Sequence, residues 1–484
     1  MVDDELFGPG TTPADVDPET ELLRAHVRVE IELLGALIEA GLVPAGPDVG
    51  GHADTGPLPD GGARPGRATR SDDGARRPDG GARHPDDAAR AEDQLDAALR
   101  AAGVPDVAGL AARSRAGGNV VIPLVKDILA AAPDDLAPAV HLGATSQDIV
   151  DTAQQLVLRD ALAAAAADLR AARNRAAGLA REHAETPRVG RTLGQVAVPT
   201  TFGLTAATWA VGLHRAALAC DRARDDLAIQ LAGAAGTAAV HGALWPDVAA
   251  ALAERLSLRV PEAPWHTERS RIRGAAAALA DAVAAAAKIG TDVAALAVTE
   301  VGELAEGGAG GSSAMPHKRN PVRAVLLRAA GIRAPGLLGT VYSASLQENE
   351  RAAGGWHAEW QPVADLVRLG RGSSNRVRDL LENLRVDAEA MRRNLDSARP
   401  YVMSEAVATA LAGRLGRAEA QAAVSRALRA GGEAPTDASV RTALRSDVGE
   451  CPELDDPRLL DPASALAAVP ALIDRALSSC RETA

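Results

Sequence analysis

The segment 311–321 places a hydroxyl, a cation and an amide within one short stretch of chain. Its sequence is GSSAMPHKRNP, and four glycines lie between positions 307 and 311. Glycines give a loop the backbone freedom and the close approach that closing over a small anion requires. Ser312 can act as a base, while Lys318 and Asn320 can bind an anionic group. A solvated Gly/Ser loop with a basic end has a similar composition, but this order of residues predicts an active-site lid.

A second polar motif, HLGATSQDIVDT, occupies positions 141–152. Thr145 or Ser146, with Asp148 close behind and an apolar run following, is typical of a helix N-terminus. Hydroxyls and backbone N–H groups at a helix N-terminus also bind carboxylates, because the positive end of the helix dipole lies there. The two roles are compatible, so we expect a helix to begin here and to hold an anion.

A third motif, GRTLGQVAVPTTFG, occupies positions 190–203. By itself this pattern is typical of a polar turn before a helix that begins at Pro199. Its polar residues gain a functional interpretation only in combination with the other two motifs.

Together the three motifs resemble those of the fumarase/aspartase superfamily, over about residues 104–424. The resemblance implies anti β-elimination, or the reverse addition, on a small polycarboxylate, through a carbanion whose charge spreads onto a carboxylate. Ser312 would be the base, with its alkoxide stabilised by backbone N–H groups and nearby cations. No cofactor and no metal are implied. The implied substrate-binding residues are His141, Thr145, Ser146, Arg191, Thr192, Gln195, Lys318 and Asn320.

One departure from the superfamily pattern bears on the leaving group. Amine-eliminating members carry His directly after the residue that matches Thr192, and this chain has Leu193. Amines leave poorly unless they are protonated, and leucine cannot supply the proton. A carboxylate, whose conjugate acid has a pKa of about 4, leaves without a proton donor. We therefore expect an acidic leaving group.

Three classes of enzyme within the superfamily are compatible with these motifs. The motifs are most similar to those of the 3-carboxy-cis,cis-muconate cycloisomerase subgroup, in which an internal carboxylate adds to an alkene. A nitrosuccinate lyase, which expels nitrite from a nitro-dicarboxylate in actinobacterial natural-product routes, fits an acidic leaving group equally well. A C–N lyase resembling adenylosuccinate lyase ranks behind both because of Leu193.

Two further segments resemble the cycloisomerase subgroup in particular. The sequence QENERAAGGWHAEW at 347–360 implies that Arg351 binds an anion, and PWHTER at 264–269 resembles a substrate-pocket turn. An exposed loop position explains His317 equally well as a substrate contact does. The possible further contacts are His266, His317 and His357.

The composition favours helices and excludes two classes of partner. The chain of 484 residues is 47% hydrophobic but only 2% aromatic, and a core of small aliphatic side chains suits closely packed helices. A net charge of −12 argues against binding to nucleic acid or to an anionic membrane surface. The three cysteines are widely separated and the acidic N-terminus has no apolar segment, so we expect a reduced, cytoplasmic protein.

Helical periodicity divides the chain into three parts. An N-terminal helical domain, 1–140, includes a Gly/Pro/Arg-rich insertion at about 44–91, whose composition is typical of disorder. A central helical bundle, 141–363, carries the glycine-led loop, and a small helical domain, 364–484, follows. The only strand-like pattern is the short apolar run 120–122.

The central segments are expected to form an all-α bundle larger than one chain. Helical patterns such as 151–184 and 271–304 exceed the usual length of a globular helix, which predicts near-parallel long helices that complete their core with copies of the same chain. With the superfamily resemblance, this implies a three-part fold, a homotetramer and composite active sites. A non-catalytic structural protein of the same fold is the alternative from another class, and the intact Ser312, Lys318 and Asn320 argue against it.

Overall fold

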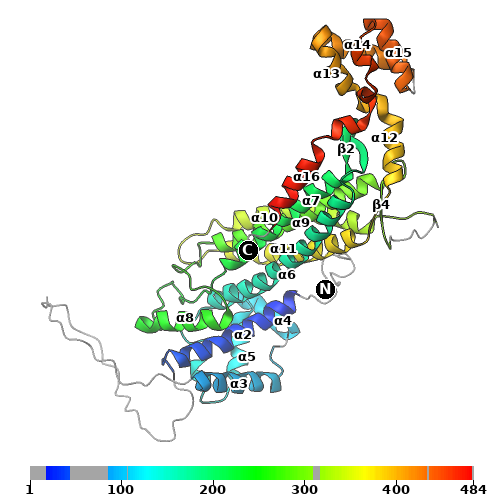
Figure 1. Cartoon of the computed structure of the whole chain (residues 1–484). Helices are drawn as coiled ribbons and strands as arrows, with labels where there is room; N and C mark the ends of the chain where they lie inside the picture. Colours follow the sequence, from blue (N-terminus) through cyan, green and yellow to red (C-terminus); the bar gives the residue numbers. More distant parts are fainter. Residues whose placement is uncertain are drawn as a thin grey trace, which may run out of the picture.

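The protein is an elongated, almost entirely helical molecule. The computed structural model describes residues 18–43, 85–105, 107–308, 315, 317–432 and 435–481. Helices make up nearly all regular structure in these ranges, apart from two short antiparallel strand pairs, which confirms the expected all-α class. Figure 1 shows three parts in a row, with N-terminal helices at one end, a long bundle in the middle and a small lobe at the other end.

Five long helices form the central bundle. Most of its buried side chains are Ala, Leu and Val, and small residues let helix axes approach closely. The C-terminal helix α16 (Val469–Ser479) returns to pack against this bundle beside α7. The five helices are α6 (Ser146–Glu182), α7 (Phe202–Asp225), α9 (Ser270–Leu296), α10 (Val322–Ala344) and α11 (Gly355–Glu382).

The helix α6 is the axis of the molecule. Its 37 residues extend over about 55 Å at 1.5 Å per residue. α11 runs parallel to α6. Two contacts show this direction: Trp356 contacts Asp151 near the start of both helices, and Arg378 pairs with Asp168 much further along. Residues at the N-terminal and C-terminal ends of α6 are therefore held far apart within one chain.

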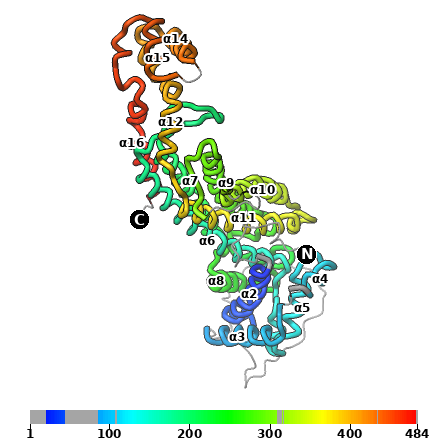
Figure 2. Tube along the Cα trace, turned by 90° about the vertical axis from the view of Figure 1, so that its right-hand side faces the viewer, coloured from blue at the N-terminus to red at the C-terminus, as the bar shows by residue number. Residues whose placement is uncertain are grey.

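The N-terminal part packs on the first turns of α6 and shares a separate hydrophobic core with them. Figure 2 shows α8 lying beside α2, although the two are distant in sequence. The helices of this part are α2 (Pro18–Glu39), α3 (Pro85–Ala101), α4 (Val107–Gly117), α5 (Val121–Ala131) and α8 (Trp245–Leu256), with short 3-10 turns at Ala137–Ala139 and Gly242–Leu244.

The predicted insertion is shorter at its C-terminal end than the composition suggested. Residues 44–84 lie outside the described residues, but α3 already begins at Pro85. A proline in the first turn and Asp86 and Asp87 beside the helix dipole are favourable start signals. The helix also buries Ala88 and Ala91, so the prediction that helical structure resumes only after residue 91 was wrong.

The predicted boundary between residues 363 and 364 falls inside a continuous helix. α11 spans this point and packs along α6 and α9. Pro362, in its interior, removes one backbone hydrogen bond without ending it, since Trp356 and Val363 are buried on either side. The separate C-terminal lobe consists of α12 (Ala388–Val402), α13 (Ser404–Leu415), α14 (Arg417–Ala430) and α15 (Asp437–Val448), followed by 3-10 turns at Pro452–Asp455, Pro457–Leu460 and Pro462–Leu466.

The third motif forms a β-hairpin rather than a turn before a helix. Strand β1 (Pro187–Thr192) pairs with β2 (Gln195–Thr201), and α7 begins only at Phe202. Leu193 and Gly194 form the two-residue turn, with φ of 52° and 78°; two-residue hairpin turns with positive φ match the strand twist. The alternative of a turn before a helix from Pro199 is wrong, since α7 begins at Phe202, where the helical pattern of the sequence also begins. The strand-like run at 120–122 is not a strand, because Val121 begins α5.

The second strand pair lies at the start of the glycine-led loop. β3 (Leu304–Glu306) pairs antiparallel with β4 (Leu384–Val386), which directly follows α11. The Glu306 carboxylate accepts hydrogen bonds from the backbone N–H groups of Arg323 and Ala324, at 3.1 and 2.8 Å. The loop therefore leaves and rejoins the bundle at fixed points near the C-terminal end of α11.

Helix α10 leaves much apolar surface uncovered in the single chain. Among the described helices it alone has the length and hydropathy of a membrane span, and only 28% of that window is buried. Ile332 is 80% exposed and Leu346, just beyond the helix, is 87% exposed. Val322, Val325 and Tyr342 are also exposed.

Candidate active site

The N-terminus of α6 forms the first half of the candidate site. Thr145 is the N-cap residue, and the Asp148 side chain accepts a hydrogen bond from the Thr145 backbone N–H at 3.0 Å. Thr145 and Ser146 are both half-buried, whereas the residues that follow are buried. Their hydroxyls thus lie beside open space at the positive end of a long helix, where a carboxylate is stabilised.

Asp148 also fixes a distant loop to this helix terminus. Its carboxylate accepts hydrogen bonds from the backbone N–H groups of Ala232 and Gly233, at 3.2 and 2.9 Å. It pairs with Nε2 of His266 at 2.8 Å. Asp148 and His266 are almost completely buried. The predicted contact His266 is thus committed to Asp148, and its contact with substrate stays a prediction.

Arg351 is held over the same helix terminus. Its guanidinium donates to the Gln147 side-chain oxygen at 3.1 Å and to the Ala234 carbonyl at 2.9 Å. Gln147 in turn donates to the backbone carbonyl of His266 at 2.8 Å. Arg351 is thus held in a fixed orientation at Gln147, the residue that follows Ser146, as binding of a carboxylate requires.

His141 forms a pair with a residue that the sequence interpretation missed. Its Nδ1 lies 2.7 Å from a carboxylate oxygen of Glu30, which is buried on α2. Burial favours the neutral ring, but the hydrogen bond and charge of Glu30 and the charge of Asp148 outweigh it, so the pKa of His141 lies above its usual value. A protonated His141 can bind a carboxylate or hold a proton beside Thr145.

The backbone geometry around His141 is unusual and tightly packed. His141 has a φ of 57°, and Gly143 has a φ of 75°. A Cβ added at Gly143 would lie 2.4 Å from Nε2 of His241, so only glycine fits there. The turn before α6 therefore depends on Gly143.

A fully buried ion network lies inside this end of the bundle. Arg269 pairs with Asp151 at 2.7 and 3.0 Å and with Glu359. Trp356 donates its indole N–H to Asp151 at 3.1 Å. His357, one residue further on, is exposed and packs its ring against Trp356 and Trp360. The network joins α6, α9 and α11 just behind the predicted anion site.

The β1–β2 hairpin forms the second half of the candidate site, beyond the other end of α6. Thr192 and Gln195 flank its turn and are exposed, and the Leu193 side chain at the tip is fully exposed. Arg191 pairs with the buried Glu303 at 2.7 and 3.2 Å. Arg191 thereby ties the hairpin to the segment that leads into the glycine-led loop, and its predicted substrate contact stays a prediction.

The described residues that flank the glycine-led loop lie near the hairpin rather than near the start of α6, since Glu303 pairs with Arg191. Residues 309–314 and 316, and with them Ser312, lie outside the described residues. His317 and Lys318 are exposed and Asn320 is half-buried, directly before α10. The backbone N–H of Lys318 donates to the Met315 carbonyl at 3.1 Å.

Two groups of predicted residues therefore lie toward opposite ends of α6. The first group, at the start of α6, consists of His141, Thr145, Ser146, His266, Arg351 and His357. The second group, at the hairpin and loop, consists of Arg191, Thr192, Gln195, His317, Lys318 and Asn320. The rigid length of α6, about 55 Å, prevents the two groups from meeting within a chain.

The all-helical bundle, the motif at the N-terminus of α6 and the glycine-led sequence motif are those of a lyase of the fumarase/aspartase superfamily. A family model described as "Lyase" matches residues 86–336, and the chain belongs to this family.

The relatives include two kinds of enzyme. The chain is 43% identical to a 3-carboxy-cis,cis-muconate cycloisomerase of Bradyrhizobium diazoefficiens, over 77% of this chain and 85% of the relative. It is 42% identical to a nitrosuccinate lyase of Streptomyces davaonensis, over 77% and 82%. The crystal structure of a 3-carboxy-cis,cis-muconate lactonizing enzyme from Pseudomonas putida matches with a TM-score of 0.78 and 34% identity, covering 98% of this chain and 99% of that one.

Proposed function

We propose that this enzyme catalyses cofactor-free anti β-elimination, or the reverse addition, on a small polycarboxylate with an acidic leaving group. The substrate that fits best is 3-carboxy-cis,cis-muconate, in which a carboxylate of the substrate adds to an alkene. The observation that carries this proposal is Leu193 at the tip of the β1–β2 hairpin. A residue without an ionisable group stands where a C–N lyase needs a proton donor. Similarity to the cycloisomerase of B. diazoefficiens supports the same substrate.

In the proposed elimination, the Ser312 alkoxide removes a proton from the carbon next to a carboxylate. The electron pair left on that carbon spreads onto the carboxylate, which Lys318 and Asn320 stabilise. The bond to the leaving group then breaks, and the leaving group departs with its electron pair. In the addition direction the same steps run in reverse, and a carboxylate oxygen forms the new bond.

The first half of the site binds and orients the substrate. Thr145, Ser146 and Arg351 hold a second carboxylate, and the raised pKa of His141 favours the protonated ring, which would add a positive charge. Two anchored carboxylates fix the angle between the carbon–hydrogen bond and the leaving group, which an anti elimination needs.

A nitrosuccinate lyase is the second candidate, supported by the S. davaonensis relative. Purified protein should be given 3-carboxy-cis,cis-muconate and, separately, nitrosuccinate. We expect loss of the diene absorbance with the first substrate and no nitrite from the second. Nitrite together with fumarate would replace the cycloisomerase proposal by the lyase. Turnover of neither substrate, but of an N-substituted succinate, would overturn the acidic leaving group.

We also propose that the active site is completed in a homotetramer, in a cytoplasmic setting. The two groups of site residues lie at opposite ends of α6, so the second group must come from another subunit. The exposed apolar side chains of α10 are typical of a surface that packs against copies of the same helix.

Mixing two inactive variants tests this arrangement. Thr145→Val and Lys318→Ala should each be inactive alone. After co-refolding in equal amounts, about one quarter of wild-type activity should return, because a site takes each residue from a different, randomly assorted subunit. Refolded wild-type protein sets the reference. No recovery in the mixture would mean that each chain builds its own site.

A further inference from the structure

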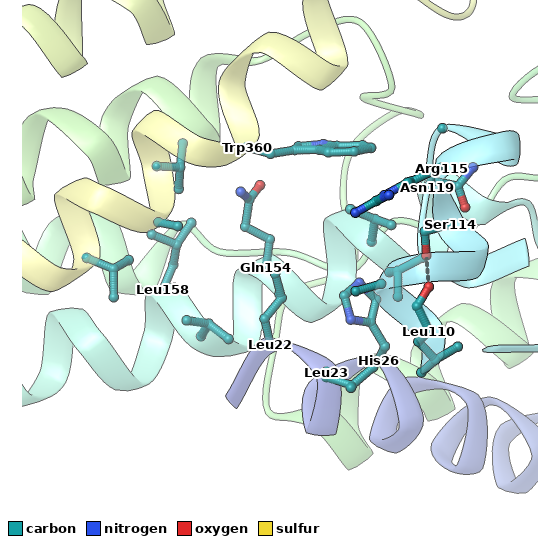
Figure 3. A pocket seen from close by; sticks show the side chains of 18 residues that line it. Leu22, Leu23, His26, Leu110, Ser114, Arg115, Asn119, Gln154, Leu158 and Trp360 are labelled. Atoms are coloured by element: carbon teal, nitrogen blue, oxygen red, sulfur yellow. Dashed lines mark hydrogen bonds between the residues drawn. The ribbon is translucent and has the colours of Figure 1, made fainter. Parts of the chain in front are cut away.

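A partly open, largely apolar cavity lies near the candidate active site, in the N-terminal part of the chain. It has a volume of about 480 Å³ and lies where α2, α4, α6 and α11 meet. Figure 3 shows the side chains that surround it. This volume is within the range of about 300–1,000 Å³ that is usual for small-molecule sites. Of the predicted site residues that the structure describes, none lines this cavity.

Buried polar atoms of His26 and Gln154, which both line the cavity, have no hydrogen-bond partner in the protein. Neither ring nitrogen of His26 has a hydrogen-bond partner, and the same holds for the side-chain oxygen of Gln154. His26 is 2% exposed and Gln154 is 7% exposed. Figure 3 shows the His26 ring and the Gln154 amide reaching into the open space from α2 and α6. Buried polar groups in native proteins are nearly always satisfied, so a ligand group is expected here.

His26 is neutral in this position. Burial lowers its pKa to about 4, and the Leu22 carbonyl one turn earlier, outside hydrogen-bond geometry, offsets this only in part. A neutral imidazole presents one N–H donor and one acceptor nitrogen. A ligand hydroxyl, which both donates and accepts, therefore matches the chemistry of the His26 ring and of the Gln154 oxygen.

The remaining walls fit a flat, apolar body. The Trp360 indole ring extends across one side of the cavity (Figure 3), and aliphatic side chains cover most of the rest. Indole faces stack favourably on other aromatic rings. The aliphatic walls include Leu22, Leu23, Leu110, Val150, Leu158 and Val367.

The rim of the cavity is positively charged. Arg115 and Asn119 line it on the side of the cavity beside α4 (Figure 3). Arg115 is exposed, and among the described lining residues none is acidic. A carboxylate at the rim would therefore find a cation and an amide donor with no opposing charge.

We propose that this cavity is a binding site for a small aromatic carboxylic acid that carries a ring hydroxyl. The ring packs against Trp360 and the aliphatic walls, the carboxylate meets Arg115 and Asn119, and the hydroxyl bonds to His26 and Gln154. The site is separate from the residues that bind the polycarboxylate substrate, so its failure would leave the proposed function unaffected.

Isothermal titration of the full-length protein with 4-hydroxybenzoate tests the proposal, because this probe carries its two polar groups at opposite ends of one ring. We expect saturable binding with one ligand per chain. Benzoate, which lacks the hydroxyl, should bind about threefold to tenfold more weakly, as expected for a lost hydrogen bond. No binding of 4-hydroxybenzoate at millimolar concentration, or equal affinity for benzoate, would overturn the proposal.

Variants locate the ligand. Gln154→Leu and His26→Leu should each weaken 4-hydroxybenzoate about threefold to tenfold but leave benzoate nearly unchanged. Gln361→Leu, an exposed glutamine of α11 outside the cavity, is the matched control and should change neither. Ala364→Phe, which fills the cavity from α11, should abolish binding of both ligands. Retained binding in the Ala364→Phe variant would contradict the site.

A second control separates the cavity from the active site. Lys318→Ala should bind 4-hydroxybenzoate as the wild type does, because Lys318 lies near the opposite end of α6. Lost binding in this variant would place the aromatic acid in the substrate site and overturn the proposal. Circular dichroism of each variant identifies any that fail to fold, and the benzoate titration of Gln154→Leu reports cavity integrity directly.

Discussion

Replacing Ser312 by alanine is expected to lower kcat by about 10²–10⁴-fold, the usual contribution of a positioned base. In the proposed site other residues bind the substrate carboxylates, so KM should change little. Steady-state kinetics of the Ser312→Ala variant on 3-carboxy-cis,cis-muconate measures both parameters. Size-exclusion chromatography should show the same assembly as the wild type, because the change removes a single hydroxyl.

The neighbouring serine provides a matched control for this substitution. Ser313→Ala removes the same group one position along the same loop and should keep kcat within about tenfold of the wild type. If Ser313→Ala abolished turnover while Ser312→Ala retained it, the base would be Ser313. If both variants remained active, the carbanion mechanism with a serine base would be wrong for this chain.

Arg269→Met is expected to lower the free energy of unfolding by about 3–5 kcal/mol. The side chains of Arg269, Asp151 and Glu359 have no exposed surface. Methionine has a similar length but no charge, so two carboxylates would remain buried without their cation. Chemical denaturation followed by circular dichroism measures the loss.

The loss should depend on pH in a defined direction. Burial already raises the pKa of Glu359 to about 7 although Arg269 opposes this, and removing the cation raises it further. A carboxyl whose folded pKa exceeds its unfolded pKa stabilises the fold at low pH, and this contribution is lost as the pH rises. The deficit of Arg269→Met should therefore be larger at pH 8 than at pH 5.

An exposed arginine provides the control. Arg259 is 59% exposed and lies 3.8 Å from an exposed Asp226, so Arg259→Met should cost about 0–1 kcal/mol. An Arg269→Met variant as stable as Arg259→Met would mean that water or relaxation satisfies the buried carboxylates.

The local features of the candidate site follow directly from the sequence. The Thr145–Asp148 pattern predicted a helix N-terminus, and α6 begins there. Such signals are readable because a cap and its partners lie within about four residues of each other. The β1–β2 hairpin is also a local feature, but it was not predicted. Its Leu193–Gly194 turn lacks the Asn-Gly or Asp-Gly pair that usually announces such a turn.

The partners of these residues were not readable from the sequence. Glu30 pairs with His141 across 111 positions, and Asp148 meets His266 across 118. The one available signal for Glu30 was its place on the apolar face of the segment that forms α2, beside Val27 and Ile31. A buried acid on such a face requires a partner, but the pattern does not say which.

The sequence by itself determined the superfamily, the all-α class and the types of residue that do the chemistry, because capping, helical periodicity and motif order are local properties of the chain. Only the tertiary structure decided which of these residues lie together. It places Thr145 and Arg351 at one end of α6, and the hairpin and Lys318 near the other. The physical reason is the stiffness of a helix of 37 residues, which keeps its two ends about 55 Å apart. The local motifs at the two ends do not reveal this separation.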